Sequence, residues 1–383
     1  MESPRSPALK RVRFLAPASD GGTLQATRSR RAVPLLVAAV YDAADLSRVD
    51  VSLVDVSSGA VVARLGGLRS GGHFGAAGGL VCLVGAGAAV RVIDPTTGAA
   101  TDVVAAPGDA APPAHNGPRS RPPSHVFGLV PATGEYKVLR ISAAAAAAHG
   151  VRAAPGQSQS QSQSCEVLTV GGREPQRWRP AQGPPAPVAA ATYRSKAVAR
   201  GVAHFLLLLP PPPHHGAECD AVASFDLAAE AWRPSLLRGP LSSSSPGGAG
   251  ARHVCRAHLS LAELSGCLAA VHHDYPGGCI DVWLLTDLDQ GAWCRTHSLR
   301  LASVLRGWGG APPDELGRRG QLVAGDRESL AQPLVALDDG RVALWVEGKG
   351  SVRVYDPRTG ACTEVADMGR YSSVIGLSTA AIE

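Results

Sequence analysis

Lysine, aromatic residues and long apolar runs are all scarce in this sequence, and their scarcity excludes several classes of protein. Aromatic residues make up only 4% of the 383 residues. The longest apolar runs, at residues 32–41 and 205–209, are too short to cross a bilayer. The first 22 residues contain basic side chains but no apolar stretch of the kind that a secretory signal needs. We therefore expect a protein of the cytoplasm or nucleus with no membrane partner.

The charge pattern is equally sparse in signals. The net charge is +5, and almost all of the basic residues are arginine. No run of basic residues alternates with aromatic ones, so the sequence does not indicate nucleic-acid binding. The eight cysteines form no Cys-x-x-Cys pair, and several fall inside apolar segments, which favours reduced, buried cysteines of an intracellular protein. The four lysines are Lys10, Lys137, Lys196 and Lys349.

What the sequence does contain is a repeated hairpin. Residues 352–365 alternate apolar and polar side chains on both sides of an Asp-Pro-Arg-Thr-Gly turn. Residues 91–103 are nearly a copy, and weaker versions occur at residues 54–59 and 128–134. Alternation around a turn that ends in glycine predicts two antiparallel strands joined by a tight connection.

The spacing of the turns predicts the architecture. The early signals recur at intervals of about 40 residues, and each interval has room for four short strands, which is the period of a propeller blade. We therefore predict an all-β fold, a β-propeller-like array of about seven four-stranded antiparallel blades, with six to eight allowed. A β-sandwich would give similar strands without the regular interval. The turn signals lie near Gly59, Gly98, Gly134, Gly171, Glu230, Gly291 and Gly360.

Composition divides the chain into two parts. Residues 1–31 are polar, rich in Arg and Ser and aperiodic, which predicts a disordered N-terminal arm. Residues 32–383 form the predicted propeller-like domain. Within it, a run of alanines and a Gln-Ser alternation predict a low-complexity insertion at about residues 142–164, between two adjacent strands.

No motif points to catalysis or to a cofactor. Gly85 and Gly87 follow an apolar strand, but Val90 stands where a dinucleotide-binding loop needs its third glycine, so a hairpin turn is the better reading. The sequence has no Gly-x-Ser-x-Gly elbow. The six tryptophans stand mostly near turns, where packing between blades is favoured over ligand stacking.

Histidine clusters do not have the spacing of a metal site. The clusters are His253, Cys255 and His258, then His272, His273 and Asp274. Neighbouring residues on a strand point to opposite faces, so His272 and His273 cannot converge on one ion. His214 and His215 follow four prolines and read as loop residues. We predict no catalytic, cofactor-binding or metal-binding residues, and the substrate-binding residues are unknown from the sequence.

The same turns and strands resemble a known family. The combination is similar to the plant F-box-associated domain, of the kelch-like type found in grasses, over roughly residues 35–380. The segments that carry the resemblance are residues 127–141, 201–206, 223–234, 259–268, 280–285 and 355–360.

That resemblance implies a function. In the family, an F-box docks on the Skp-type adaptor of a cullin-RING (SCF-type) ubiquitin ligase, and the associated domain recruits the protein substrate. No F-box is visible before residue 35, where the chain is polar and interrupted by prolines. The expectation is a non-catalytic protein-protein interaction domain for ubiquitin-dependent degradation. The alternatives are a stand-alone or competing recognition domain without ligase association, or an enzyme or small-ligand binder on a propeller scaffold.

Overall fold

The structure is a computed structural model. It describes residues 34–70, 73–85, 89–103, 123–143, 163–171, 176–191, 193–208, 220–243, 258–306, 331–369 and 372–377. The predicted N-terminal arm, residues 1–31, lies outside this part of the chain, and so do most of the predicted insertion, His214, His215, His253 and Cys255.

The described residues form six four-stranded antiparallel sheets, so the all-β prediction is confirmed. Each sheet is one propeller blade whose strands follow one another from the channel outward. The blades, innermost strand first, are β24 (Ser372–Leu377), β1 (Leu35–Tyr41), β2 (Arg48–Asp55), β3 (Val61–Arg69); β4 (His73–Ala77), β5 (Leu80–Val84), β6 (Val90–Ile93), β7 (Ala100–Val103); β8 (Ser124–Val130), β9 (Glu135–Ala143), β10 (Gln163–Val170), β11 (Arg179–Ala181); β12 (Lys196–Ala199), β13 (Val202–Leu206), β14 (Val222–Asp226), β15 (Ala231–Trp232); β16 (Leu259–Leu264), β17 (Cys267–Asp274), β18 (Cys279–Asp287), β19 (Ala292–Arg300); and β20 (Ala331–Ala336), β21 (Val342–Val346), β22 (Ser351–Asp356), β23 (Ala361–Asp367).

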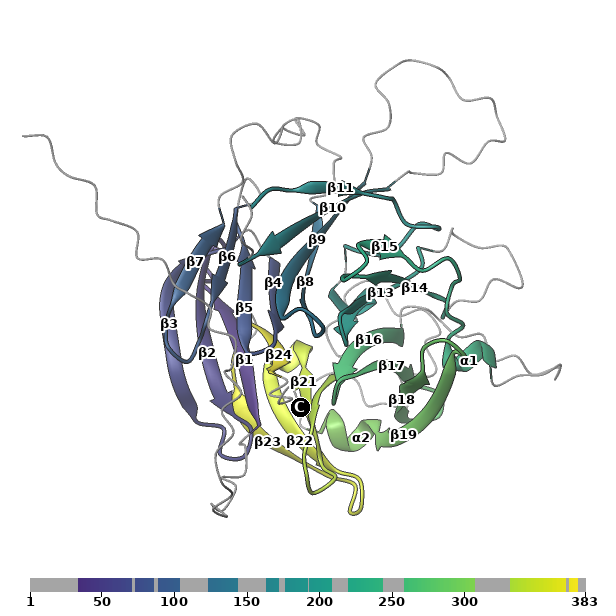
Figure 1. The fold of residues 1–383 in the computed structure, drawn as a ribbon. Coiled ribbons are helices and arrows are strands. Elements are labelled where there is room, and N and C mark those ends of the chain that lie inside the picture. The colour runs from purple at the N-terminus through teal and green to yellow at the C-terminus, as the bar shows by residue number, and fades with distance from the viewer. Residues whose placement is uncertain are drawn as a thin grey trace, which may run out of the picture. The chain divides into compact units, whose positions relative to one another are not determined.

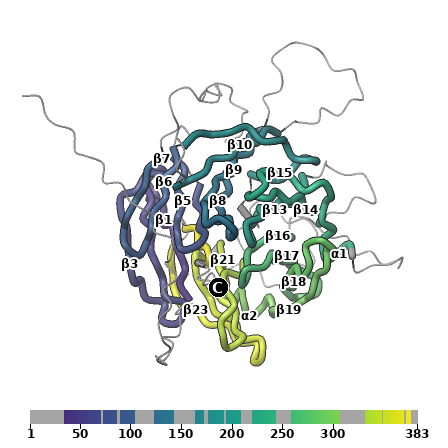
Figure 2. Tube along the Cα trace, viewed as in Figure 1, coloured from purple at the N-terminus to yellow at the C-terminus, as the bar shows by residue number. Residues whose placement is uncertain are grey.

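The blades stand around a ring, as Figures 1 and 2 show from the purple first blade to the yellow last one. The innermost strands β4, β8, β12, β16, β20 and β24 are neighbours in this order, and β24 returns to β4. The ring is closed by a strand from the end of the described chain, because β24 pairs with β1 from Leu35↔Leu377 to Val40↔Ser372. Closure in this way removes the exposed ends that an open array would have to cap.

The blade number lies within the predicted range of six to eight. The seven turn signals exceed the six blades because two of them belong to one blade. Gly134 lies in the turn between β8 and β9, whereas Gly171 follows β10 of the same sheet. The insertion between β9 and β10 separates these two glycines by about one repeat length, so their spacing imitates a blade boundary.

The repeated hairpin is the outer turn of the blades in three of its four copies, and an aspartate stabilises each of these three; the copy at residues 128–134 is the inner turn between β8 and β9 and has no aspartate. Asp55, Asp94 and Asp356 end the third strand of three blades, and each accepts a hydrogen bond from the backbone N–H two residues later, at 2.7 to 2.9 Å. Asp226 and Asp287 do the same in two further blades. Such turns hold their own backbone without help from the rest of the chain. Gly360, with a φ of 70°, closes the Asp356 turn in the conformation that glycine adopts most easily.

The core lies between the blades. Most β-branched and leucine side chains of the second and third strands are buried, since both faces of a blade pack against neighbours. The two tryptophans that begin outer strands reach the preceding connection, as predicted for inter-blade packing: the Nε1 of Trp232 donates to the Gln182 carbonyl at 2.9 Å, and that of Trp293 to the Arg238 carbonyl at 2.8 Å. Of the six described cysteines, Cys82 and Cys165 are buried, but Cys294 is exposed, so burial is not general.

Helices are few. The described residues contain two single-turn helices, α1 (Pro240–Ser243) and α2 (Leu301–Val304), and the 3-10 turns η2 (Tyr193–Ser195) and η5 (Glu347–Lys349). No helix in the described part of the chain combines the length and the apolar character that crossing a bilayer requires.

One innermost strand does not follow from the sequence pattern. Residues 66–79 read as a glycine-rich link, yet β4 occupies residues 73–77 of it. Its sequence, His-Phe-Gly-Ala-Ala, contains no β-branched residue. Pairing with β5 stabilises the strand, and small residues suit its place at the channel, because a Cβ on Gly75 would already lie 3.3 Å from the Cβ of Phe127.

Candidate functional site

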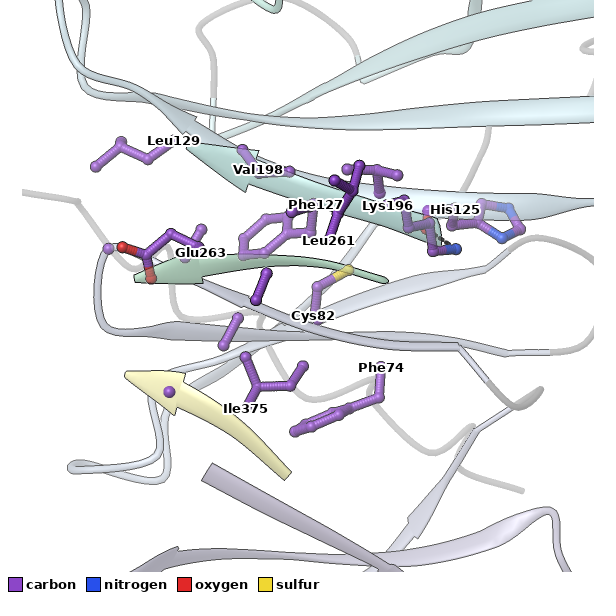
Figure 3. Close-up of a pocket in the computed structure, with 18 of the residues that line it drawn as sticks. Phe74, Cys82, His125, Phe127, Leu129, Lys196, Val198, Leu261, Glu263 and Ile375 are labelled. Carbon is purple, nitrogen blue, oxygen red and sulfur yellow. Dashed lines mark hydrogen bonds between the residues drawn. The ribbon is translucent and has the colours of Figure 1, made fainter. Parts of the chain in front are cut away.

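The site lies in the central channel, where the six innermost strands surround a cavity of about 510 Å³. All six innermost strands contribute lining residues, so the cavity belongs to the ring as a whole and to no single blade. A volume of this size falls in the range of small-molecule pockets. Figure 3 shows the residues that line it.

The channel has two different ends. We call the face at which the innermost strands begin the link face, because the connections from blade to blade arrive there. We call the opposite face the turn face, because the tight hairpins after the innermost strands lie there. His73, His125 and Lys196 mark the link end of the cavity, and Gly78 and Pro131 mark its turn end.

The middle of the channel is apolar. Phe74 of β4 and Phe127 of β8 project into it with Val198, Leu261 and Ile375, each from a different innermost strand. The ring of Phe127 also stacks on Tyr136, with centroids 5.5 Å apart, so its orientation is fixed by the neighbouring strand. This wall would contact the apolar body of a ligand and exclude water from it.

The link end carries a basic cluster, which we define as His73, His125 and Lys196. The Lys196 ammonium donates to the Ser124 hydroxyl at 2.5 Å and to the His125 backbone carbonyl at 3.0 Å. The imidazole rings of His73 and His125 meet edge to face with centroids 4.7 Å apart. Three consecutive blades therefore bring nitrogen atoms to one place, as the close-up shows for His125 and Lys196.

Burial controls the protonation of this cluster. Loss of solvent lowers the pKa of Lys196 to about 8. Burial lowers the pKa of His125 well below its usual value, and the nearby His73, Lys196 and Arg140 lower it further. The pKa of His73 is also lowered, first by burial and then by the Lys196 charge. At neutral pH the cluster therefore consists of neutral imidazoles beside one ammonium.

The side chains of Arg140 and Trp178 pack on the side of His125 that faces its own blade. The Arg140 guanidinium lies 4.3 Å from the centre of the Trp178 ring, and this ring lies 6.1 Å from that of His125. The charge of Arg140 is matched by Glu166, whose carboxylate accepts a hydrogen bond from the Arg140 Nε at 2.7 Å. Arg140 thus packs and pairs within its own blade, and Lys196 is left as the cation at the cavity wall.

The turn end has a different character. Glu263 of β16 lines the cavity there, and Figure 3 places it with Leu129 away from His125 and Lys196. Burial raises the pKa of the Glu263 carboxyl, although the Gly266 backbone N–H donates a hydrogen bond to it. The guanidinium of Arg200 donates to the Gly266 carbonyl at 3.1 Å. Arg200 also lines the cavity, so the turn end carries both a carboxylate and a guanidinium, whereas the described residues of the link end offer no carboxylate.

Reactive chemistry has little support at this site. Burial raises the pKa of the Cys82 thiol, which lines the cavity, to about 12, so this cysteine stays protonated and is a poor nucleophile. The Ser124 hydroxyl is buried and donates to the Ala190 carbonyl at 2.5 Å. No group of three potential metal ligands occurs among the described side chains.

The sequence did not single out any residue of the basic cluster. The histidines that it did single out lie elsewhere: His273 is fully buried, and its Nε2 contacts the Ala331 carbonyl at 3.0 Å, while His258 packs on Tyr275. A usable signal was present, because His73 and Lys196 each begin an innermost strand and His125 stands second in one. To use this signal, one must know which segments form the innermost strands, and the sequence pattern predicted those strands only in part.

Comparisons with known proteins give distant structural neighbours alone. No family model matches the sequence, and no curated protein matches it. The chain is similar to hydrazine synthase of Kuenenia stuttgartiensis, with 13% identity, coverage of 88% of this chain and 80% of that chain, and a TM-score of 0.38. A chain of a nidogen/laminin complex gives 9% identity, coverage of 90% and 97%, and a TM-score of 0.43. The β-propeller domain of Cps50 (Swd1) from Myceliophteria thermophila gives 11% identity, coverage of 83% and 80%, and a TM-score of 0.36. With TM-scores below 0.5, these neighbours support no argument about activity or partners.

Proposed function

We propose that this protein is a non-catalytic recognition domain that binds another protein through its link face. The observation that carries the proposal is the distribution of connection lengths. The six longest connections each join a strand that ends at the link face to a strand that begins there; by residue number they span 104–123, 144–162, 182–195, 207–221, 233–258 and 301–330. Long connections on a rigid scaffold are where binding residues concentrate.

The turn face offers much less to a partner. Its connections are short, and several are closed by the aspartate hydrogen bonds described above. Five large apolar side chains of the described residues are exposed. Leu46, Leu208 and Leu236 lie in link-face connections, with exposed fractions of 58%, 43% and 40%, whereas Val61 and Val62, at 53% and 55%, begin the outer strand β3. Apolar side chains of this kind can anchor a protein interface.

The class of partner rests on the family resemblance. If the chain works as the F-box-associated domain does, the partner is a protein destined for ubiquitin-dependent degradation, and an SCF-type ligase acts on it. Without an F-box, the domain would act alone or compete with complete relatives for the same substrate. The proposal places the protein in the cytoplasm or nucleus.

Binding experiments with purified components can distinguish a ligase subunit from a domain that acts alone or competes. The full chain would be mixed with a purified Skp-type adaptor and cullin, and binding measured by size-exclusion chromatography. Co-elution would support a ligase subunit. No co-elution, together with a substrate whose half-life in cells lengthens when the chain is overexpressed, would support the competing version. Shortened substrate half-life without adaptor binding would contradict both.

A second candidate function is a small-ligand binder, which is favoured by one specific feature. Phe74 and Phe127 face a cavity that the ring encloses, and polar groups converge at its link end. Concave, mostly apolar cavities with a few convergent polar groups are typical of ligand sites. The two functions are compatible, because a ligand held in the channel would lie beneath the face that we propose for the protein partner.

A further inference from the structure

Lys196 is a partly buried cation to which the described chain offers no acidic partner. Its ammonium contacts two neutral oxygen atoms, the Ser124 hydroxyl and the His125 carbonyl, and burial alone accounts for its lowered pKa. An ammonium has three N–H donors, and these two contacts use two of them. A charge held out of water without a counterion costs free energy, so the position has the properties of an anion site.

Other donors at the same end are also unused. Both ring nitrogens of His125 are buried and have no hydrogen-bond partner within the described residues, and the same holds for the Gln332 Nε2. His125 is 91% buried by its exposed fraction of 9%. Buried polar atoms are nearly always paired, so unpaired ones in a cavity wall indicate a missing ligand or water.

The charge balance selects the ligand. Among the described residues, Lys196 alone is a cation at the cavity wall at this end, because His73 and His125 are neutral at pH 7 and Arg140 is matched by Glu166. One ammonium can balance one negative charge. A dianion such as phosphate would leave a second charge buried and uncompensated, so a monoanion fits better.

The rest of the channel gives the ligand its shape and direction. The wall formed by Phe74, Phe127 and Ile375 fits an apolar body next to the anionic group. The turn end is lined by both Glu263 and Arg200, whereas the described lining residues at the link end include Lys196 and no carboxylate, so the link end is the better position for the anionic group.

We propose that the channel binds an organic monocarboxylate, with its carboxylate at the basic cluster and its apolar body against Phe74 and Phe127. This inference rests on the small-ligand function proposed above. The carboxylate would accept hydrogen bonds from the Lys196 ammonium and from whichever ring nitrogen of His125 carries its proton, and the Gln332 amide would add a third donor.

The test compares two probes of the same shape. Naphthalene-2-carboxylate and naphthalene-2-carboxamide would be titrated by calorimetry into the full chain at pH 7. The carboxylate should bind roughly 10-fold or more tightly, since a hydrogen bond to a charged group is worth that much in affinity. The same titrations would use Lys196→Met, which should bring the two affinities close together.

A matched control removes a charge elsewhere on the same face. Lys349 lies in the 3-10 turn η5 of the link face, and its ammonium contacts the Arg306 carbonyl at 3.4 Å. Lys349→Met should leave the preference for the carboxylate unchanged. Loss of the preference in this variant would show that net charge, and not the basic cluster, selects the probe.

The outcomes separate this inference from the function beneath it. If neither probe binds, the small-ligand function fails and the inference fails with it. If both bind equally to the wild type, the cavity holds ligands but the carboxylate preference is refuted. Should Lys196→Met not fold, the wild type can be titrated at pH 7 and pH 10, where loss of the Lys196 proton must reduce the preference. The titratable groups near it are His73 from β4, His125 from β8 and the Arg140–Glu166 pair from β9 and β10.

Discussion

The two faces of the propeller are built on different principles. On the turn face, each connection is stabilised locally, as in the turn that begins at Asp94 and ends at Gly98. On the link face, polar groups such as those of His125 and Gln332 are buried and unpaired within the described residues. The comparison teaches that the two faces differ at the channel and not in their turns, because link-face turns also close on aspartates such as Asp42, Asp45 and Asp274. At the link end of the channel, buried polar atoms of the described residues stay unpaired, and we propose that these serve recognition. Six substitutions at five positions test this difference.

The largest effect should follow from a glycine on the turn face. Gly59 has a φ of 70°, and a Cβ there would lie only 2.0 Å from the Val365 carbonyl oxygen of the next blade. Gly59→Ala should therefore reduce the free energy of unfolding in urea by about 3 kcal/mol or more, since the backbone must shift.

Gly134 provides the control for that experiment. It has a φ of 69° on the same face, but a Cβ there would meet no atom within 4 Å. Gly134→Ala should cost only about 1 kcal/mol, the strain of the left-handed backbone alone. Equal losses in the two variants would contradict the role of the contact between blades.

Substitution of Lys196 should change the free energy of unfolding in the opposite direction and stabilise the protein. Because burial lowers its folded pKa from 10.5 to about 8, the protonated lysine destabilises the folded state at pH 7, and this penalty disappears as the pH rises through 8 towards 10.5. Lys196→Met removes the penalty of roughly 3 kcal/mol but also two hydrogen bonds of about 1 kcal/mol each, so it should stabilise the protein by about 1 kcal/mol.

Urea unfolding at pH 7 and pH 10 would check this sign. A gain at pH 7 that is lost at pH 10 would agree with a lysine kept for binding at the expense of stability. A clear loss of stability at pH 7 would instead show that Lys196 holds the fold together through Ser124 and His125.

A turn-face aspartate should have an effect of moderate size. Asp94 accepts hydrogen bonds from the Thr96 N–H and the Thr97 hydroxyl, each at 2.8 Å. Asp94→Ala should cost about 1 kcal/mol in thermal unfolding, since both donors lose a partner. Asp94→Asn keeps an acceptor oxygen and should cost less; an equal loss would mean that the negative charge matters more than the hydrogen bonds.

The smallest effect is expected on the link face. Lys349→Met should change the free energy of unfolding by no more than about 0.5 kcal/mol, because its ammonium makes one long contact in a surface turn. A larger loss in urea unfolding would show that the link face stabilises the fold as the turn face does.

The sequence predicted the scaffold better than the site. The hairpins around Asp94 and Asp356 were readable because the turn chemistry is local and repeated. The closure of the ring was not readable, because the pairing of β24 with β1 joins distant parts of the chain. Strand β4 was hidden for a related reason: its small residues suit the channel and carry no strand signal of their own.

The basic cluster depends on the same long-range information. His73, His125 and Lys196 stand in three different blades, and nothing in their own neighbourhoods distinguishes them from surface residues. Only the ring brings them together and removes them from water. Lys196 is a candidate anion site because it is removed from water and has no counterion among the described residues. Both are properties of the folded chain.

The most direct test of the division between the faces is a crosslinking map. A photo-reactive phenylalanine would replace Leu46 or Leu208 on the link face, and Thr133 or Arg358 on the turn face; all four positions are exposed. Each full-length variant would be irradiated in plant cell extract, and the adducts identified by mass spectrometry and scored for Skp-type adaptor and cullin. We expect the two link-face positions to capture the same partner and the turn-face positions to capture none. Capture of that partner from Thr133 or Arg358 instead would contradict recognition through the link face.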